Sequence, residues 1–201
     1  MNFEPNKSLP KIIAVSKTFK IGHILPLINH GHLDFGENKV QEALDKWADI
    51  KEKNKSIKLH LVGKLQTNKV KFALKIFDFI HSLDNEKLAK KIADEQIKYD
   101  QKPKIFIQIN IGNENQKSGI SKQNFKEFYE YSKNLGLDII GTMCIPPFDE
   151  DPSKYFREIQ NFNKELNLNE ISMGMSNDYL KAIEYNATYL RIGSSIFGQR
   201  S

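Results

Sequence analysis

The chain has 201 residues, of which 39% are hydrophobic and 27% charged, as is ordinary for one globular domain. Its single cysteine, Cys144, excludes an internal disulfide and a cysteine-rich zinc site, and no apolar run approaches the roughly 18 residues of a membrane-spanning helix. The opening segment, MNFEPNKSLP, matches neither a secretory signal nor a transit peptide. We therefore expect a single domain over residues 1–201 that works in the cytoplasm, without a membrane partner.

The net charge of +5 could indicate nucleic acid or another anionic partner. However, the lysines are spread along the chain among acidic residues, and the sequence holds no zinc-finger or RNA-recognition motif. We therefore expect no nucleic-acid partner. A solvated lysine-rich surface and a basic rim that attracts phosphorylated small molecules both fit this charge.

Short apolar runs, several rich in β-branched residues, predict eight buried strands. In chain order these runs cover residues 12–15, 33–35, 59–62, 79–83, 105–111, 139–145, 170–173 and 189–192. Apolar residues at three- and four-residue spacing predict helices over 37–54, 86–99 and 125–134, and 177–185 also fits a helix. We expect Asp84 to cap the second of these helices and Ser121 or Asn124 the third, with Gly31 and Gly136 at helix ends.

Alternation of strand and helix along the whole chain predicts an α/β fold, and eight strands favour a single (β/α)8 barrel of the TIM type. A doubly wound open sheet is the alternative, because strand order cannot be read from one sequence. In either fold, functional residues gather at the carboxyl ends of the strands.

Lys17 directly follows the first predicted strand. A lysine that leaves a buried strand for a pocket is partly desolvated, which lowers the pKa of its amine, and a neutral amine can form a Schiff base with an aldehyde. The alternative is a strand-end lysine that reaches for solvent.

Two turns rich in glycine and serine follow the last two predicted strands. They are Gly174-Met175-Ser176 and Gly193-Ser194-Ser195. Free amides and serine hydroxyls suit a phosphate, and the loops after strands seven and eight are the usual phosphate site of this barrel. Each turn alone could be an ordinary turn, but together with Lys17 they suit a ligand with a phosphate and a carbonyl group. Pyridoxal 5′-phosphate (PLP) is such a ligand, and a sugar phosphate bound by a Schiff-base aldolase is the alternative.

Arg191 lies inside the last, otherwise apolar strand. It needs an anionic or acceptor partner, which could be a structural salt bridge or the pyridine nitrogen of the cofactor. Because arginine stays protonated, it can only donate to that nitrogen and keeps the ring unprotonated. Such a site binds the cofactor but restrains its chemistry.

The remaining polar candidates are weaker. Glu37 and Asn38 open a predicted helix, where capping is at least as good an explanation as ligand binding. His60 alternates with leucines and is either an interior histidine or a pocket residue. The five histidines lack the spacing of metal ligands, so we expect no metal, and Cys144 fits a core position.

The sequence resembles the pyridoxal-phosphate homeostasis proteins, relatives of the N-terminal barrel of alanine racemase. The matching stretches run in order over nearly the whole chain: 14–18 (AVSKT), 35–42 (FGENKVQE), 60–69 (HLVGKLQTNK), 108–111 (QINI), 117–119 (KSG), 141–143 (GTM), 172–178 (SMGMSND) and 191–198 (RIGSSIFG).

The resemblance implies a role for each matching residue. Lys17 looks like the lysine that holds PLP as an internal aldimine, and Arg191 like the arginine that faces the pyridine nitrogen. Lys117 looks like a lysine at the pocket mouth that takes part in cofactor transfer. The implied phosphate ligands are Ser176, Gly193 and Ser194. Asn38 and Met143 match positions that line the pocket.

The resemblance also implies a carrier that buffers or delivers PLP, with PLP-dependent apo-enzymes as recipients and no catalytic residue. The alternative is a PLP-dependent amino-acid racemase or lyase. Racemases of the related fold carry a second, β-rich domain, for which a chain that stops at Ser201 leaves no room. We expect a monomer, with a weak dimer as the alternative.

One feature departs from the family. Its members have a helix of about twenty residues before the first strand, which would span roughly 30 Å. Only eleven residues, MNFEPNKSLPK, stand there in this chain, and we expect no helix after the last strand. From both features, the sequence does not predict how the barrel closes between the first and last strands.

Overall fold

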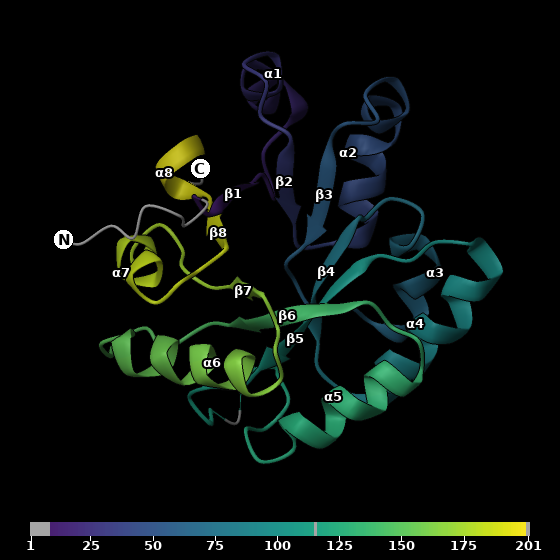
Figure 1. The fold of residues 1–201 in the computed structure, drawn as a ribbon. Coiled ribbons are helices and arrows are strands. Elements are labelled where there is room, and N and C mark those ends of the chain that lie inside the picture. Colours follow the sequence, from purple (N-terminus) through teal and green to yellow (C-terminus); the bar gives the residue numbers. More distant parts are fainter. Residues whose placement is uncertain (1–8, 115, 200–201) are drawn as a thin grey trace.

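The computed structural model describes residues 9–114 and 116–199. Eight parallel strands close into a barrel in chain order, β1 to β8 (Figure 1). They are β1 (Lys11–Val15), β2 (Asp34–Glu37), β3 (Lys58–Leu61), β4 (Phe79–Leu83), β5 (Lys104–Ile109), β6 (Ile139–Cys144), β7 (Glu170–Ser172) and β8 (Tyr189–Ile192). The predicted barrel is therefore confirmed, and the open sheet is excluded.

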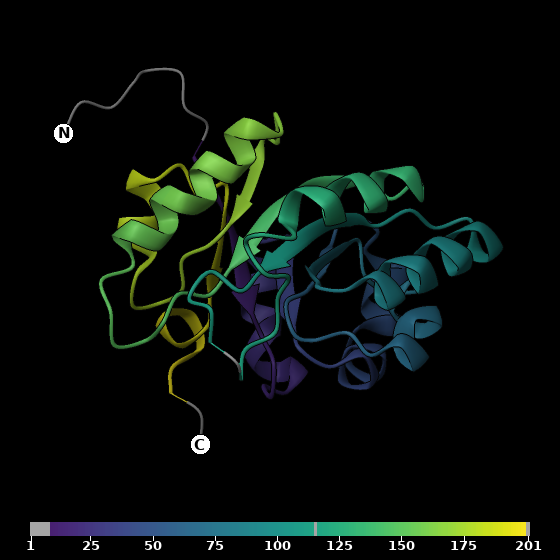
Figure 2. The same cartoon turned by 90° about the horizontal axis from the view of Figure 1, so that it is seen from below.

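Helices surround the barrel and follow one another in chain order, clockwise in Figure 1 from α1 at the top. Figure 2 shows the molecule turned by 90°, so that it is seen from below. They are α1 (Ile21–Asn29), α2 (Val40–Lys53), η1 (Thr67–Lys69), α3 (Val70–Ala73), α4 (Glu86–Tyr99), α5 (Phe125–Asn134), α6 (Ser153–Glu165), α7 (Tyr179–Glu184) and α8 (Ser194–Phe197).

Strand β8 pairs with β1 over four residue pairs, from Lys11 opposite Tyr189 to Ala14 opposite Ile192. This ladder closes the barrel, so the short segment before β1 does not prevent closure. Residues 1–8, where the family's additional helix would be sought, lie outside the described residues. The expectation of no helix after the last strand is wrong, because the short helix α8 follows β8 directly.

Helix ends agree in part with the sequence. Gly31 and Gly136 follow α1 and α5 with φ of +95° and +76°, as expected for left-handed helix ends. The N-cap of α4 is Asn85 and not Asp84, because the Asn85 side chain accepts a hydrogen bond from the Leu88 amide at 2.9 Å. Asn124 stands at the N-cap of α5 without a side-chain cap bond, and its own amide donates to Ser121 Oγ.

Successive side chains of each strand point alternately outward and inward, which creates two buried regions. We call the first the outer layer. It packs the outward side chains against the helices and includes Phe35, Trp47, Ile92 and Phe156. We call the second the barrel interior, which consists of Ile13, Val15, Phe79, Phe106, Met143 and Tyr189 with the buried polar residues His60, His81, Ser172 and Arg191.

Candidate functional site

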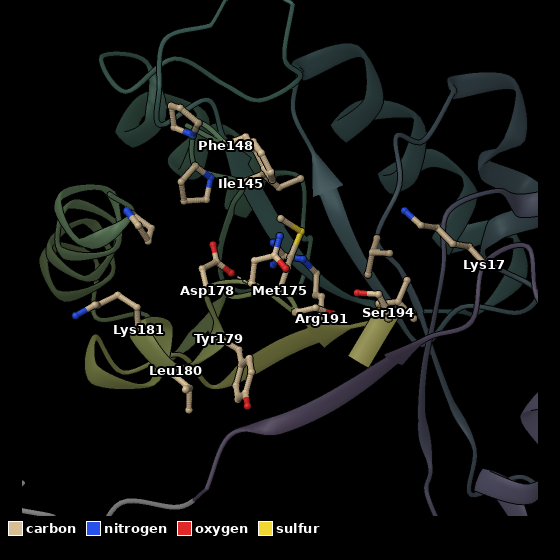
Figure 3. A pocket seen from close by; sticks show the side chains of 18 of the residues that line it. Lys17, Ile145, Phe148, Met175, Asp178, Tyr179, Leu180, Lys181, Arg191 and Ser194 are labelled. Carbon is tan, nitrogen blue, oxygen red and sulfur yellow. Dashed lines mark hydrogen bonds between the residues drawn. The ribbon is translucent and has the colours of Figure 1, made fainter. Parts of the chain in front are cut away.

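A cavity of about 1270 Å³ opens at the carboxyl ends of the strands. Six of the residues that the sequence singled out line it: Lys17, Lys117, Ser176, Arg191, Gly193 and Ser194. Figure 3 shows Lys17 at one side of this cavity, Ser194 and Arg191 next to it, and Lys181 at the far side. The barrel therefore brings together residues that are up to 177 positions apart, because β1 and β8 are neighbours.

Lys17 is half-buried at the end of β1, and the backbone that follows it is unusual. Thr18 has φ of +70°, a left-handed conformation that a β-branched residue rarely adopts. The Thr18 amide donates to Glu42 Oε1 at 2.6 Å. This bond holds the chain in the turn that carries Lys17 into the cavity.

A buried charged network lies beneath this turn. Glu37 Oε1 accepts hydrogen bonds from Ser16 Oγ at 2.7 Å, Lys46 Nζ at 2.9 Å and Trp47 Nε1 at 2.9 Å. Lys46 also donates to the Ser16 carbonyl and to Glu42. The network therefore joins β2 and α2 to both residues that flank Lys17.

This network corrects the expectation for Glu37. The residue ends β2 and is fully buried, and α2 begins only at Val40, so Glu37 caps no helix. The sequence reasoning missed Lys46 and Glu42 as well. The signal available was their spacing of four residues, which places a salt-bridging pair on one face of a helix.

The two glycine-serine turns contact each other at the cavity wall. The Ser195 amide donates to Ser176 Oγ at 3.4 Å, and the Met175 amide donates to Asp178 Oδ1 at 2.6 Å. Gly174 has φ of +89°, and a Cβ at this position would lie 2.7 Å from Ala182 Cβ. Only glycine fits there, so the turn that presents Ser176 depends on Gly174.

Arg191 lines the cavity and is buried, with 5% of its surface exposed. Its guanidinium donates to Ser172 Oγ at 2.8 Å and to the Cys144 carbonyl at 2.8 Å. Burial lowers the pKa of Arg191 from its ordinary value. Within residues 9–114 and 116–199 it has no carboxylate at ion-pair distance, and it lines the cavity.

Two predicted pocket residues do not line this cavity. Met143 is fully buried in the barrel interior. Asn38 is half-buried beside Gly63, and its Oδ1 is buried without a hydrogen-bond partner in the described part of the chain. Their roles as ligand contacts stay predictions.

Lys117 lies at the mouth of the cavity. Its amine donates to the Pro146 carbonyl at 3.1 Å and pairs with Glu114 Oε2 at 2.5 Å. The same mouth carries two exposed apolar side chains that the sequence reasoning did not single out, Phe148 and Leu180.

The other candidates belong to the interior. His60 is fully buried and bonded to Asp34 and His81, which makes it an interior histidine and not a residue of the cavity wall. Cys144 is a core residue as predicted, and burial raises the pKa of its thiol to about 12.

Two wider features of the described residues bear on the site. Over 9–114 and 116–199, no three His, Cys, Asp or Glu side chains form a cluster that could hold a metal ion. None of the helices in these ranges has both the length and the apolarity to cross a membrane.

Comparison with known proteins agrees with this geometry. The family model of the alanine racemase N-terminal domain matches residues 6–201. A pyridoxal phosphate homeostasis protein of Aquifex aeolicus is 38% identical over 200 residues, covering 94% of this chain and 87% of the relative. Its counterpart in Escherichia coli is 32% identical, covering 94% and 85%.

Solved structures show the same fold. PipY of Synechococcus elongatus, solved with PLP bound, superposes with a TM-score of 0.88 at 32% identity, covering 94% of this chain and 92% of PipY. Alanine racemase of Clostridium difficile, at 14% identity, shares the fold over 53% of its own length with a TM-score of 0.75. The chain therefore belongs to the pyridoxal phosphate homeostasis protein family, within the wider family of alanine racemase N-terminal domains.

Proposed function

We propose that this protein binds PLP as a Schiff base on Lys17, and that it buffers or delivers the cofactor without turning over a substrate. The observation that carries the proposal is the common cavity of Lys17, Arg191 and the turns that end in Ser176 and Ser194. These residues offer an amine, a cation and hydroxyl groups to the aldehyde, the ring nitrogen and the phosphate. The printed names of the relatives and the PLP-bound PipY support it.

Lys17 is suited to the aldehyde. It is half-buried between the cavity and the Glu37 network, and its two neighbours in sequence are fixed by Glu37, Glu42 and Lys46. A fixed backbone aims the amine at one place, which lowers the entropy cost of forming the C=N bond with loss of one water.

The glycine-serine turns suit the phosphate. Ser176 and Ser194 line the cavity with Gly193, where no side chain blocks the approach of a phosphate oxygen to the backbone. The Ser176 hydroxyl accepts from the Ser195 amide and can donate its own proton to a phosphate oxygen. Lys117 and Lys181 also line the cavity, and each forms a salt bridge with a nearby glutamate, Glu114 and Glu184.

Arg191 bears on carrier function rather than turnover. Bound PLP supplies an electron sink whose strength depends on protonation of its ring nitrogen. Arg191 can only donate a hydrogen bond to this nitrogen, so it holds the nitrogen unprotonated and restrains the sink. This chemistry favours retention and release of PLP over reactions of amino acids.

Absorption spectroscopy with a matched pair of variants tests the cofactor and its lysine. The wild-type protein, incubated with PLP, is expected to show a visible Schiff-base band that borohydride abolishes. Lys17→Ala is expected to lack the band, whereas Lys20→Ala, which changes an exposed lysine three residues away, should keep it. A wild-type protein without the band would end the proposal.

A transfer assay separates a carrier from an enzyme. The loaded protein is mixed with a PLP-dependent apo-enzyme, and the activity that appears is compared with that given by an equal concentration of free PLP. In parallel, amino acids are incubated with the loaded protein. Consumption or racemisation faster than with free PLP would replace the carrier by a racemase or lyase.

A further inference from the structure

A continuous chain of hydrogen bonds crosses the barrel interior and ends on Arg191. Asp34 Oδ1 lies 3.0 Å from His60 Nε2, His60 Nδ1 lies 3.0 Å from His81 Nε2, and His81 Nδ1 lies 2.8 Å from Ser172 Oγ. Ser172 Oγ in turn accepts from Arg191 at 2.8 Å. The chain thus connects β2, β3, β4, β7 and β8.

The two ends of this chain lie at opposite mouths of the barrel. Asp34 is the first residue of β2, and 23% of its side chain is exposed. Arg191 is next to the last residue of β8 and lines the cavity. The three groups between them, His60, His81 and Ser172, are fully buried, so the hydrogen-bond chain runs from one mouth to the other out of contact with solvent.

Aromatic rings fix both imidazoles in place. The His60 ring stacks on Phe79 with centroids 4.2 Å apart, and the His81 ring stacks on Phe106 with centroids 4.3 Å apart. Tyr189 meets Phe106 and His81 edge-on. The ring nitrogens therefore keep their alignment along the chain.

The Arg191 end fixes the direction of the hydrogen bonds. Arginine only donates, so Ser172 Oγ accepts from it. Within the described residues Ser172 Oγ has just one further partner, His81 Nδ1. The hydroxyl proton must point there, because a buried donor without an acceptor is costly. His81 Nδ1 is then the acceptor, and His81 carries its proton on Nε2.

The Asp34 end gives the same direction independently. A carboxylate only accepts, so His60 carries its proton on Nε2 and points it at Asp34. His60 Nδ1 is then the acceptor for the His81 Nε2–H. Every bond from Arg191 to Asp34 therefore points the same way, with a cation at one end and an anion at the other.

The charges around the chain agree with this arrangement. Burial lowers the pKa of His60 and lowers that of His81 well below its ordinary value, so both rings are neutral. Burial acts to raise the pKa of Asp34, but its hydrogen bond with His60 and the nearby Lys11 bring it below the ordinary value. Asp78 is a second carboxylate that acts on His60 through space.

We propose that Asp34, His60, His81 and Ser172 form a one-way hydrogen-bond chain that positions Arg191 for its ligand, so that Asp34 acts on the cofactor site from the opposite mouth of the barrel. The proposal rests on PLP binding beside Arg191. Asp34 is thus a positioning residue, because it acts through other residues and does not line the cavity.

The direction of the chain is testable without cofactor. Long-range proton–nitrogen NMR correlation spectra of the ¹⁵N-labelled, PLP-free protein report the tautomer of each imidazole. We expect His60 and His81 to be neutral with the proton on Nε2. A proton on Nδ1 of either ring, or a charged ring near neutral pH, would overturn the chain. In Ser172→Ala, the His81 Nδ1 signal should shift because it loses its donor.

The positioning role is testable by a double-mutant cycle on the dissociation constant of PLP. We expect Asp34→Asn to weaken binding by about 3- to 10-fold, as for loss of a charged hydrogen-bond partner. In a Ser172→Ala background the same change should have almost no effect, because the chain is already broken. Asp138→Asn, which alters an exposed carboxylate beside β6 at the same mouth, should leave binding unchanged.

Each outcome separates this inference from the proposed function. An equal effect of Asp34→Asn in both backgrounds, or no effect in the wild type, overturns the positioning role while PLP binding stands. A wild-type protein that binds no PLP overturns the proposed function and the positioning role together.

Discussion

The outer layer and the barrel interior solve different problems with the same strands. The outer layer holds most of the buried aliphatic and aromatic side chains, and it supplies the burial that holds helices on the barrel. The interior gives up part of its volume to His60, His81, Ser172 and Arg191. The contrast teaches that side chains on one face of a strand can serve stability while the alternate side chains serve the site.

Removal of a large outer-layer side chain should affect stability alone. Phe156 is fully buried between α6 and the barrel. We expect Phe156→Ala to lower the free energy of unfolding by about 4 kcal/mol, through lost burial and a cavity. Urea titration measures this, and the protein that remains folded should still form the Schiff-base band. Lys164→Ala, on the exposed side of α6, is the control and should leave the stability unchanged. Loss of the Schiff-base band in folded Phe156→Ala would show that the outer layer also serves the site.

In the Glu37 network, a change in the outer layer should affect both the stability of the protein and its binding of PLP. The side chains of Lys46 and Glu37 are 9% and 0% exposed. Lys46→Met leaves a buried carboxylate without its cation, and we expect a loss of about 3 kcal/mol together with weaker PLP binding. The double variant Glu37→Gln/Lys46→Met should regain part of the stability. Equal stability of the single and double variants would show that the charge itself is unimportant.

Low pH should destabilise the protein through the histidines of the barrel interior rather than through the outer layer. Burial depresses the pKa values of His60 and His81 in the folded state, so below the unfolded value near 6.5 the unfolded chain binds more protons. The stabilisation from the neutral histidines is therefore fully present above about pH 6.5, and the free energy of unfolding falls as the pH is lowered below it, with a limiting slope of about 1.4 kcal/mol per pH unit for one histidine.

Urea titrations at about pH 7.5 and about pH 5.5 measure this fall. His30→Gln, which changes an exposed histidine, should leave it intact, whereas His81→Phe should reduce it. If the free energy of unfolding falls by the same amount in His81→Phe, groups other than His81 cause the pH dependence.

The smallest effect is expected at the turn that carries Lys17. Thr18 has φ of +70°, where asparagine is more favourable than threonine. We expect Thr18→Asn to raise the free energy of unfolding by about 1 kcal/mol, because the strain is relieved and the amide bond to Glu42 is kept. Thr18→Ala, which keeps a Cβ without the asparagine side chain, should give less. No difference between the two would mean that the turn is unstrained.

Strands and turns could be predicted from the sequence because their signals are local. Short apolar runs, several of them rich in β-branched residues, predicted the eight strands, and Gly174 and Gly193 marked the turns beside Arg191. Helix α8 was missed because four residues leave no periodicity to detect. Adjacent Asp84 and Asn85 are both good caps, and only the geometry separates them.

Contacts that depend on barrel closure could not be predicted. The chain from Asp34 to Arg191 uses five strands, and its links join residues as far as 91 positions apart. No local pattern fixes which interior residues share a level in the barrel. The Glu37 network likewise depends on how α2 is rotated against β2. For the same reason, the sequence could not show that Met143 lies in the interior rather than on the cavity wall.

The buried thiol of Cys144 can report local opening of the folded protein. Its thiol is fully buried, with a pKa raised to about 12, so a thiol reagent cannot attack it in the closed barrel. The carbonyl of the same residue accepts a hydrogen bond from Arg191. The thiol packs in the outer layer, whereas the carbonyl binds Arg191 at the cavity, so Cys144 joins the two regions through a single residue of β6. The rate at which a thiol reagent labels the chain's one cysteine is therefore expected to measure how often the outer layer opens locally around β6.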